Sequence, residues 1–266
     1  ACTRPIIAVL HGLEGSKNSH YAKGMLSAIK AQGWVGVLMH FRGCSGRPNR
    51  MPQSYHSGQT CDVDYFSQYL ASNYPEAKKA IVGFSLGGNV LTKYLAQQKQ
   101  NIYQAACVIC APLDLSSCSN RINRGFSRVY QKYLVDMLRA STVEKIKANL
   151  LHNIDTTRLN SVRSIRDFDQ MVTAPINGFI DANDYYKQAS GRDVLQQITT
   201  PCLIIHATDD PFLCHVNTTA ITSLPKQMTF EVSAKGGHVG FISGNNPFKP
   251  RYWLEQRIPE FFTRYL

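Results

Sequence analysis

The chain has 266 residues, of which 44% are hydrophobic and 18% are charged, and its formal net charge is +11 at pH 7. A chain of this length and composition buries a sizeable core, which excludes an intrinsically disordered protein. No apolar run approaches the roughly 18 residues that a transmembrane helix needs, and no signal sequence is visible, so the sequence predicts a soluble cytoplasmic protein.

The first part of the chain alternates between apolar runs and amphipathic segments. Residues 5–10 (PIIAVL) are continuously apolar, which predicts a strand buried on both faces. A helix and a second buried strand over residues 34–39 are expected to follow, and then a helix with Val63, Phe66 and Leu70 on one face. This alternation is typical of a parallel α/β sheet.

Residues 80–95 (AIVGFSLGGNVLTKYL) predict a strand, a sharp turn and a helix, with Ser85 at the turn. The pattern Gly-x-Ser-x-Gly is typical of a nucleophile elbow, in which a strained backbone exposes the serine hydroxyl. Gly83 and Gly87 would relieve the crowding beside that turn. The same pentapeptide also occurs as an ordinary turn, so the assignment depends on partners found downstream.

The second part of the chain interrupts this alternation and then resumes it. A strand over residues 105–110 precedes a polar, basic and helical stretch, roughly residues 115–195, which we interpret as a helical cap inserted before the acid-bearing strand. Strands are expected again over residues 202–206 and around 228–232, followed by an apolar C-terminal helix. The sequence predicts a single α/β domain over residues 1–266, with a mainly parallel sheet flanked by helices.

An acid and a histidine follow Ser85 in the chain order of the α/β hydrolases. Asp210 comes just after the strand over residues 202–206, and His238 lies in a Gly-Gly loop after the next strand. Serine needs a base within hydrogen-bond reach, and the base needs a carboxylate that fixes its tautomer. Ser85, His238 and Asp210 are therefore predicted to be the nucleophile, base and acid of a serine hydrolase.

Asp209 is the alternative to Asp210 as the acid. In this turn the acid is expected to follow the strand after one small residue and two further residues, which favours Asp210. Asp209 is then expected to hold the turn through backbone hydrogen bonds. The histidines outside the first loop and the triad are expected to have structural or surface roles: His20, His40, His56, His152, His206 and His215.

Attack on a carbonyl creates an oxyanion, which two backbone N–H groups must stabilise. One donor is predicted to be Leu86, directly after the nucleophile. The other is Leu13 in the first strand–helix loop, where His11 and Gly12 are predicted to bind substrate. Each donor stabilises the transition state by about 2.7–4 kcal/mol.

Six segments together resemble a known family: residues 11–16 (HGLEGS), 41–46 (FRGCSG), 55–58 (YHSG), 83–89 (GFSLGGN), 207–212 (ATDDPF) and 236–238 (GGH). They are similar to the YheT-like branch of the α/β hydrolases over nearly the whole chain. The resemblance implies the α/β-hydrolase fold, the triad Ser85, Asp210 and His238, and hydrolysis of carboxylic esters with short or medium acyl chains.

Members of this branch usually carry two or more strands before the first strand found here. Either the natural protein is short, or an N-terminal part is absent, where eukaryotic members have a membrane anchor.

Two other functions are compatible with the sequence. An acyltransferase would pass the acyl group from Ser85 to an alcohol. A binding module would use residues 121–166, which hold ten Lys or Arg and three Asp or Glu, to bind nucleic acid or to make peripheral contact with an anionic membrane surface. These basic residues can equally form a solvated helix face, and no nucleic-acid-binding signature accompanies them. The predicted partner is a small-molecule or lipid ester, not nucleic acid.

The eight cysteines lack the spacing of a disulfide framework, which is typical of reduced thiols in a cytoplasmic protein. Cys107 and Cys110 form a C-x-x-C pattern inside a strand-like run, where they would face opposite sides of the sheet. Packing in the core is therefore expected for both, rather than metal or redox chemistry. The sequence predicts no cofactor and no metal site.

Overall fold

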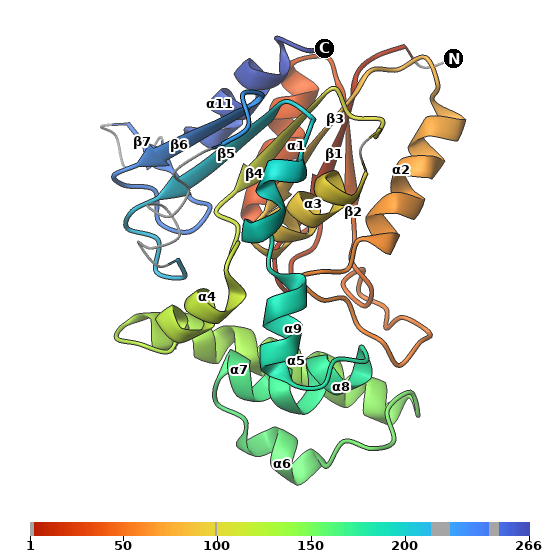
Figure 1. Cartoon of the computed structure of the whole chain (residues 1–266), viewed down its shortest axis with the longest axis vertical. Helices are drawn as coiled ribbons and strands as arrows, with labels where there is room; N and C mark the ends of the chain where they lie inside the picture. The colour runs from red at the N-terminus through yellow and green to blue at the C-terminus, as the bar shows by residue number, and fades with distance from the viewer. Residues whose placement is uncertain (1–2, 99, 214–223, 245–249) are drawn as a thin grey trace.

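The computed structural model describes residues 3–98, 100–213, 224–244 and 250–266, so Cys2, Cys214 and His215 lie outside the described residues. In the described part, six parallel strands form one sheet in the order β2-β1-β3-β4-β5-β6 (Figure 1). The strands are β1 (Ile6–Leu10), β2 (Val35–Met39), β3 (Lys79–Phe84), β4 (Ala105–Ile109), β5 (Cys202–Ala207) and β6 (Met228–Ser233). A separate antiparallel ribbon pairs β7 (Ile242–Ser243) with β8 (Arg251–Tyr252).

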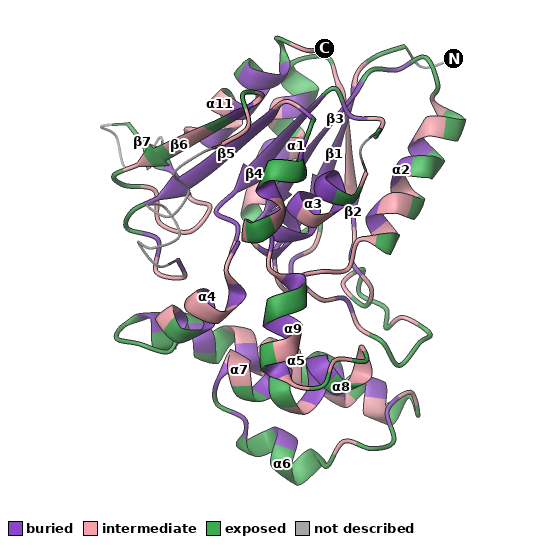
Figure 2. Ribbon diagram, in the orientation of Figure 1, coloured by how far each residue is buried: buried purple, intermediate pink, exposed green. Residues whose placement is uncertain are grey.

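The four central strands are buried along their whole length, whereas the two edge strands are not (Figure 2). The apolar runs in β1, β3, β4 and β5 are continuous because helices cover these strands on both faces of the sheet. The prediction of a fully buried strand over residues 34–39 is wrong, because only Met39 of β2 is buried. Among the described strands, β2 pairs with β1 alone, so it lies at the sheet edge.

Helices cover both faces of the sheet and close two separate hydrophobic cores. On one face, α1 (His20–Ala31) and α11 (Leu254–Phe262) bury side chains such as Ile29 and Phe262. On the other face, α2 (Cys61–Asn73) and α3 (Leu86–Gln97) bury side chains such as Leu70 and Leu91. In the helix over 61–73, the sequence-predicted apolar face is present: Val63 and Leu70 are fully buried, and Phe66 packs against them in part.

The chain between β4 and β5 has only helices as regular secondary structure, and those from α4 to α9 lie beyond the carboxyl ends of the strands, below the sheet in Figure 1. We call this segment, Leu115–Gln197, the helical insertion. It contains α4 (Leu115–Ile122), α5 (Ser127–Lys147), α6 (Thr156–Ser161), α7 (Ile165–Phe168), the π-helix η1 (Asp169–Thr173), α8 (Ala174–Ile176), α9 (Ala182–Ala189) and the 3-10 helix η2 (Arg192–Gln197). Among the described residues, no helix has the length and hydropathy that a bilayer span requires.

Side-chain caps determine where several helices of the insertion begin. Asp114, Asp155, Ser164 and Asp181 each occupy an N-cap, and each side chain accepts a hydrogen bond from a backbone N–H of the first turn. Such caps satisfy donors that would otherwise be unpaired, and they are worth about 1 kcal/mol each. Although this stretch is polar in composition, its capping residues therefore define where these short helices begin.

Cys107 and Cys110 pack in the same hydrophobic core, which differs from the prediction that they face opposite sides of the sheet. β4 ends at Ile109, and Cys110 has a φ of 47°, so the alternation of a strand no longer holds at that residue. Both thiols are fully buried, and burial raises the pKa of each well above that of a free cysteine.

Candidate active site

Ser85 lies at the sharp turn between β3 and α3, with a φ of 52° and a ψ of −122°. Its backbone N–H donates to the carbonyl of Ile109, which holds the turn against β4 (2.8 Å). A Cβ at Gly83 would lie 2.5 Å from the carbonyl oxygen of Gly87, and a Cβ at Gly87 would lie 2.4 Å from the carbonyl oxygen of His11. Only glycine fits at both flanks, which is the steric reason for the Gly-x-Ser-x-Gly pattern.

The structure brings Ser85, His238 and Asp210 together at the carboxyl edge of the sheet. The Ser85 Oγ lies 2.9 Å from His238 Nε2, and His238 Nδ1 lies 2.8 Å from an Asp210 carboxylate oxygen. The carboxylate of Asp210 is completely buried, whereas the His238 side chain keeps 14% of its surface exposed. This arrangement can move a proton from the serine hydroxyl to the imidazole while the carboxylate holds the ring.

Asp209 and Asp210 have different partners, although they are adjacent in sequence. Asp210 uses one oxygen for His238 and the other to accept from the backbone N–H of Phe212 (2.8 Å). Asp209 accepts from the backbone N–H groups of Gly236 and Gly237, at 2.9 and 2.8 Å. Asp209 therefore holds the histidine loop rather than its own turn.

The ring of Phe212 stacks on the imidazole of His238, with centroids 4.1 Å apart. The Gly-Gly sequence before the histidine is also sterically required, because a Cβ at Gly236 would lie 2.7 Å from the ring of Phe241. Gly237 has a φ of 58°, a left-handed conformation that glycine adopts at low cost. The stacking ring and the tight loop together fix the orientation of the imidazole.

The first strand–helix loop places the backbone N–H of Leu13 between two N–H groups that already have partners. Gly12 donates to the hydroxyl of Tyr21 (2.7 Å), and Glu14 donates to the hydroxyl of Tyr55 (2.6 Å). Within the described residues, the N–H groups of Leu13 and Leu86 have no hydrogen-bond acceptor. Both residues line the same cavity as Ser85, so both N–H groups can serve a ligand there.

His11 lies outside the cavity lining, which differs from its predicted contact with substrate. Its ring is fully buried: Nδ1 donates to the carbonyl of Gly12 (2.7 Å), and Nε2 accepts from the backbone N–H of Phe41 (3.1 Å). Burial lowers the pKa of His11 to about 4, so the ring is neutral at pH 7. This placement indicates that the His11 side chain positions the loop that holds Gly12 and Leu13, rather than contacting the substrate directly.

A cavity of about 500 Å³ opens onto Ser85 and His238. This volume is within the range of about 300–1,000 Å³ for small-molecule sites. The helical insertion supplies most of the apolar side chains that line the cavity, and we call these residues the apolar wall: Leu115, Ile122, Leu134, Leu138, Ile165, Phe168, Val172 and Ile176. An apolar group of a ligand would therefore extend from the serine toward the insertion.

The profile of the protein family described as "alpha/beta hydrolase fold" matches residues 5–245. The chain belongs to this α/β-hydrolase family. The protein named "Putative esterase YheT" of Escherichia coli (strain K12) is 47% identical over 265 residues, which cover 99% of this chain and 78% of that protein. The "Monoacylglycerol lipase" of Saccharomyces cerevisiae is 29% identical over 269 residues, which cover 97% of this chain and 59% of that protein.

Solved structures show the same fold at low sequence identity. The esterase Pf2001 of Pyrococcus furiosus superimposes with a TM-score of 0.63 at 16% identity, covering 99% of this chain and 82% of that chain. The predicted α/β-hydrolase fold and the predicted similarity to YheT are therefore both confirmed.

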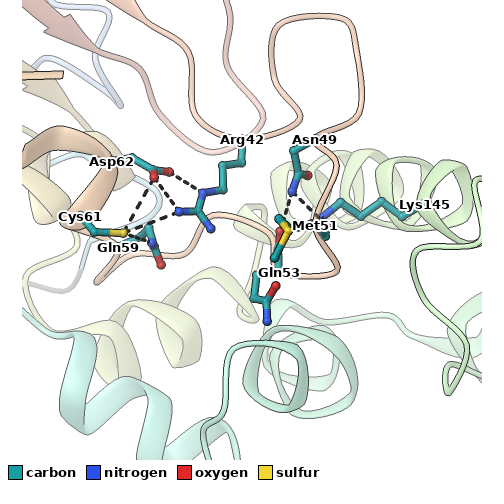
Figure 3. Close-up of polar contacts among 8 residues, drawn as sticks. All are labelled: Arg42, Asn49, Met51, Gln53, Gln59, Cys61, Asp62 and Lys145. Carbon is teal, nitrogen blue, oxygen red and sulfur yellow. Dashed lines mark hydrogen bonds and ion pairs between the residues drawn. The ribbon is translucent and has the colours of Figure 1, made fainter. Parts of the chain in front are cut away.

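Polar side chains also line the cavity of this α/β hydrolase, among them Glu14, Arg42 and Lys145, and Figure 3 shows the contacts of Arg42 and Lys145. The Arg42 guanidinium makes two hydrogen bonds to the carboxylate of Asp62, at 2.6 and 2.7 Å. The Lys145 ammonium of α5 donates to three backbone carbonyls of residues 51–53 and to the hydroxyl of Ser54, at 2.8–3.3 Å. Lys145 thereby fastens the helical insertion to the loop before α2.

Asn89 connects three segments around the elbow, a role that the sequence did not reveal. Its buried amide nitrogen donates to the carbonyls of Ser57 and Ala189, both at 2.8 Å, and its oxygen accepts from the N–H of Gly191 (2.9 Å). The motif GFSLGGN includes this residue, but its partners lie 32 to 102 residues away. No local pattern indicates such contacts.

Replacing Asn89 with alanine is expected to lower the free energy of unfolding by about 2–4 kcal/mol, because two carbonyls and one N–H lose their buried partner. Urea denaturation measures the change. Asn73→Ala is the matched control, since Asn73 is exposed and makes a single bond to the carbonyl of Tyr69. A loss no larger than that of the control would show that Asn89 does not join these segments.

Proposed function

We propose that this α/β hydrolase is a serine carboxylic-ester hydrolase that acts on short- or medium-chain acyl esters through an acyl-enzyme intermediate. The observation that carries the proposal is the hydrogen-bonded chain from Ser85 Oγ through His238 to Asp210, at 2.9 and 2.8 Å. Relatives named esterase and lipase support ester hydrolysis as the reaction.

In the acylation step, the Ser85 Oγ attacks the carbonyl carbon of the ester, and its proton moves to His238 Nε2. Asp210 accepts a hydrogen bond from Nδ1–H and stabilises the imidazolium that forms. The N–H groups of Leu13 and Leu86 stabilise the oxyanion of the tetrahedral intermediate. Collapse of this intermediate breaks the bond to the alcohol oxygen, which takes the proton from Nε2 and leaves.

In the deacylation step, His238 removes a proton from a water molecule, whose oxygen attacks the acyl carbonyl of the acylated Ser85. A second tetrahedral intermediate forms at the same two N–H donors. Its collapse releases the carboxylic acid, and the serine oxygen recovers its proton from Nε2. Both steps use the same geometry, so one arrangement of three side chains serves the whole cycle.

The helical insertion acts as a cap that holds the acyl chain. Its apolar residues line the cavity next to Ser85, whereas the alcohol side of the ester faces the polar side chains of Arg42 and Glu14. An apolar wall of leucine, isoleucine and phenylalanine side chains in a cavity of about 500 Å³ favours a chain that fills it and disfavours one that exceeds it. The preference for short or medium acyl chains follows from this limit.

A panel of p-nitrophenyl esters tests the proposed substrate class. We expect kcat/KM to rise from acetate to butyrate or octanoate and to fall for palmitate. Leu138→Phe, which adds volume to the apolar wall, is expected to move the optimum toward shorter chains. No hydrolysis of any ester by the wild type, with Ser85→Ala as the background control, would reject the proposal. An optimum unchanged by Leu138→Phe would reject this assignment of the acyl wall.

The acyl-enzyme can also react with an alcohol instead of water. Addition of ethanol to the same assay distinguishes the two outcomes, because a hydrolase still releases the acid whereas a transferase diverts the product to the ethyl ester. We propose hydrolysis as the main reaction. We also propose a cytoplasmic location, which agrees with the six described cysteines that form no disulfide.

A further inference from the structure

Four large apolar side chains, three of α5 and that of its N-cap residue, face solvent together. Phe126, Val129, Tyr130 and Tyr133 are 76%, 58%, 42% and 64% exposed. Their spacing of i, i+3, i+4 and i+7 places them on one side of the helix, opposite the side that holds its buried residues, such as Gln131 and Val135. Single exposed apolar residues are common, but a stripe of four large ones on one helix marks a contact surface.

Basic side chains lie directly beside this apolar stripe. Arg128 and Lys132 of α5 line a cleft with Arg163 and Arg166, and Asp167 is the only acid in its lining among the described residues. Lys132 pairs with Asp136 on the surface, and Arg166 lies over the ring of Tyr186. Within the described residues, the Arg128 guanidinium has no hydrogen-bond partner, so it is available to an anion.

The stripe is joined to the active site by direct contacts. The ring of Tyr130 lies 5.5 Å from that of Phe212, which stacks on the imidazole of His238 at 4.1 Å. The buried hydroxyl of Ser127, between stripe positions, donates to the carbonyl of Pro211, next to Asp210 (2.7 Å). A ligand that lies on the stripe is therefore next to the loop that carries Asp210 and Phe212.

We propose that this face of α5 docks on a membrane surface that contains anionic lipids. Phenylalanine and tyrosine side chains would enter the interface between headgroups and acyl chains, and Arg128 and its neighbours would contact phosphate groups. The excess of positive charge over residues 121–166 complements such a surface. Docking would bring lipid esters to the mouth of the cavity. This consequence rests on the proposed function, whereas the membrane binding does not depend on it.

Vesicle co-sedimentation tests the docking in the Ser85→Ala background, in which no lipid is hydrolysed. The vesicles contain phosphatidylcholine alone or phosphatidylcholine with phosphatidylglycerol. We expect binding to the anionic vesicles and a loss of about tenfold or more in the Phe126→Ser/Tyr133→Ser double variant. Arg128→Gln is expected to weaken binding to anionic vesicles only. Tyr65→Ser on α2 is the matched control, because Tyr65 is also 76% exposed, and we expect it to bind like the parent.

A second readout separates this proposal from the proposed function. With Ser85 present, Phe126→Ser/Tyr133→Ser is expected to hydrolyse soluble p-nitrophenyl butyrate at the wild-type rate, because neither side chain lines the cavity. Equal binding to both vesicle types, or no effect of the double variant, would overturn the docking proposal. A dimer that dissociates on the same double substitution, without vesicle binding, would also overturn it and assign the stripe to a second copy.

Discussion

Replacing Ser85 with alanine is expected to lower kcat for p-nitrophenyl butyrate by about 10⁴–10⁶-fold. Alanine leaves His238 and the two N–H donors in place but removes the hydroxyl oxygen that lies within hydrogen-bond distance of the imidazole. The oxyanion donors and substrate binding alone leave a small residual rate. Initial rates at saturating ester, with the folded state checked by circular dichroism, give the change.

Ser119→Ala is the matched control for this substitution. Ser119 also lines the cavity and is buried, but its hydroxyl accepts from Tyr186 (3.2 Å) and has no imidazole partner among the described residues. We expect its rate to stay within about tenfold of the wild type. Comparable losses in the two variants would mean that the elbow serine has no special chemical role.

Replacing Asp210 with asparagine is expected to lower kcat by about 10³–10⁴-fold. The amide nitrogen can donate to His238 Nδ1, which favours the tautomer that cannot accept the proton of Ser85. The buried site also loses the negative charge that stabilises the imidazolium. The same ester assay, compared with the wild type at equal protein concentration, measures the effect.

Asp209→Asn is the neighbouring control, because it removes the same charge one residue away. Its remaining amide oxygen still accepts from Gly236 and Gly237, so the histidine loop keeps its shape. We expect a loss below about tenfold. If Asp209→Asn were the more harmful of the two, the acid would have to be reassigned to Asp209.

The fold could be predicted from the sequence because its signals are local. Continuous apolar runs identify the central strands β1, β3, β4 and β5, and the elbow needs glycine at 83 and 87 for steric reasons that the structure shows directly. Chain order then brings Ser85, Asp210 and His238 to one sheet edge, because carboxyl ends of parallel strands lie together.

The parts that sequence did not predict depend on contacts between distant segments. Asn89 and Lys145 each bind groups more than 30 residues away, and no spacing in the chain indicates such partners. The burial of His11 was missed for the same reason, since its acceptor role depends on the N–H of Phe41 in another loop. The exposed edge of β2 likewise depends on sheet order, which β2 alone cannot reveal.

Labelling with an active-site fluorophosphonate, followed by mass spectrometry of the digested protein, tests the central assignment most directly. The reagent forms a covalent phosphonyl ester only with a serine that a neighbouring base activates. We predict one modified peptide, which carries the adduct on Ser85, and a strong loss of labelling in His238→Ala. An adduct on another serine, or labelling that persists in Ser85→Ala, would contradict the account.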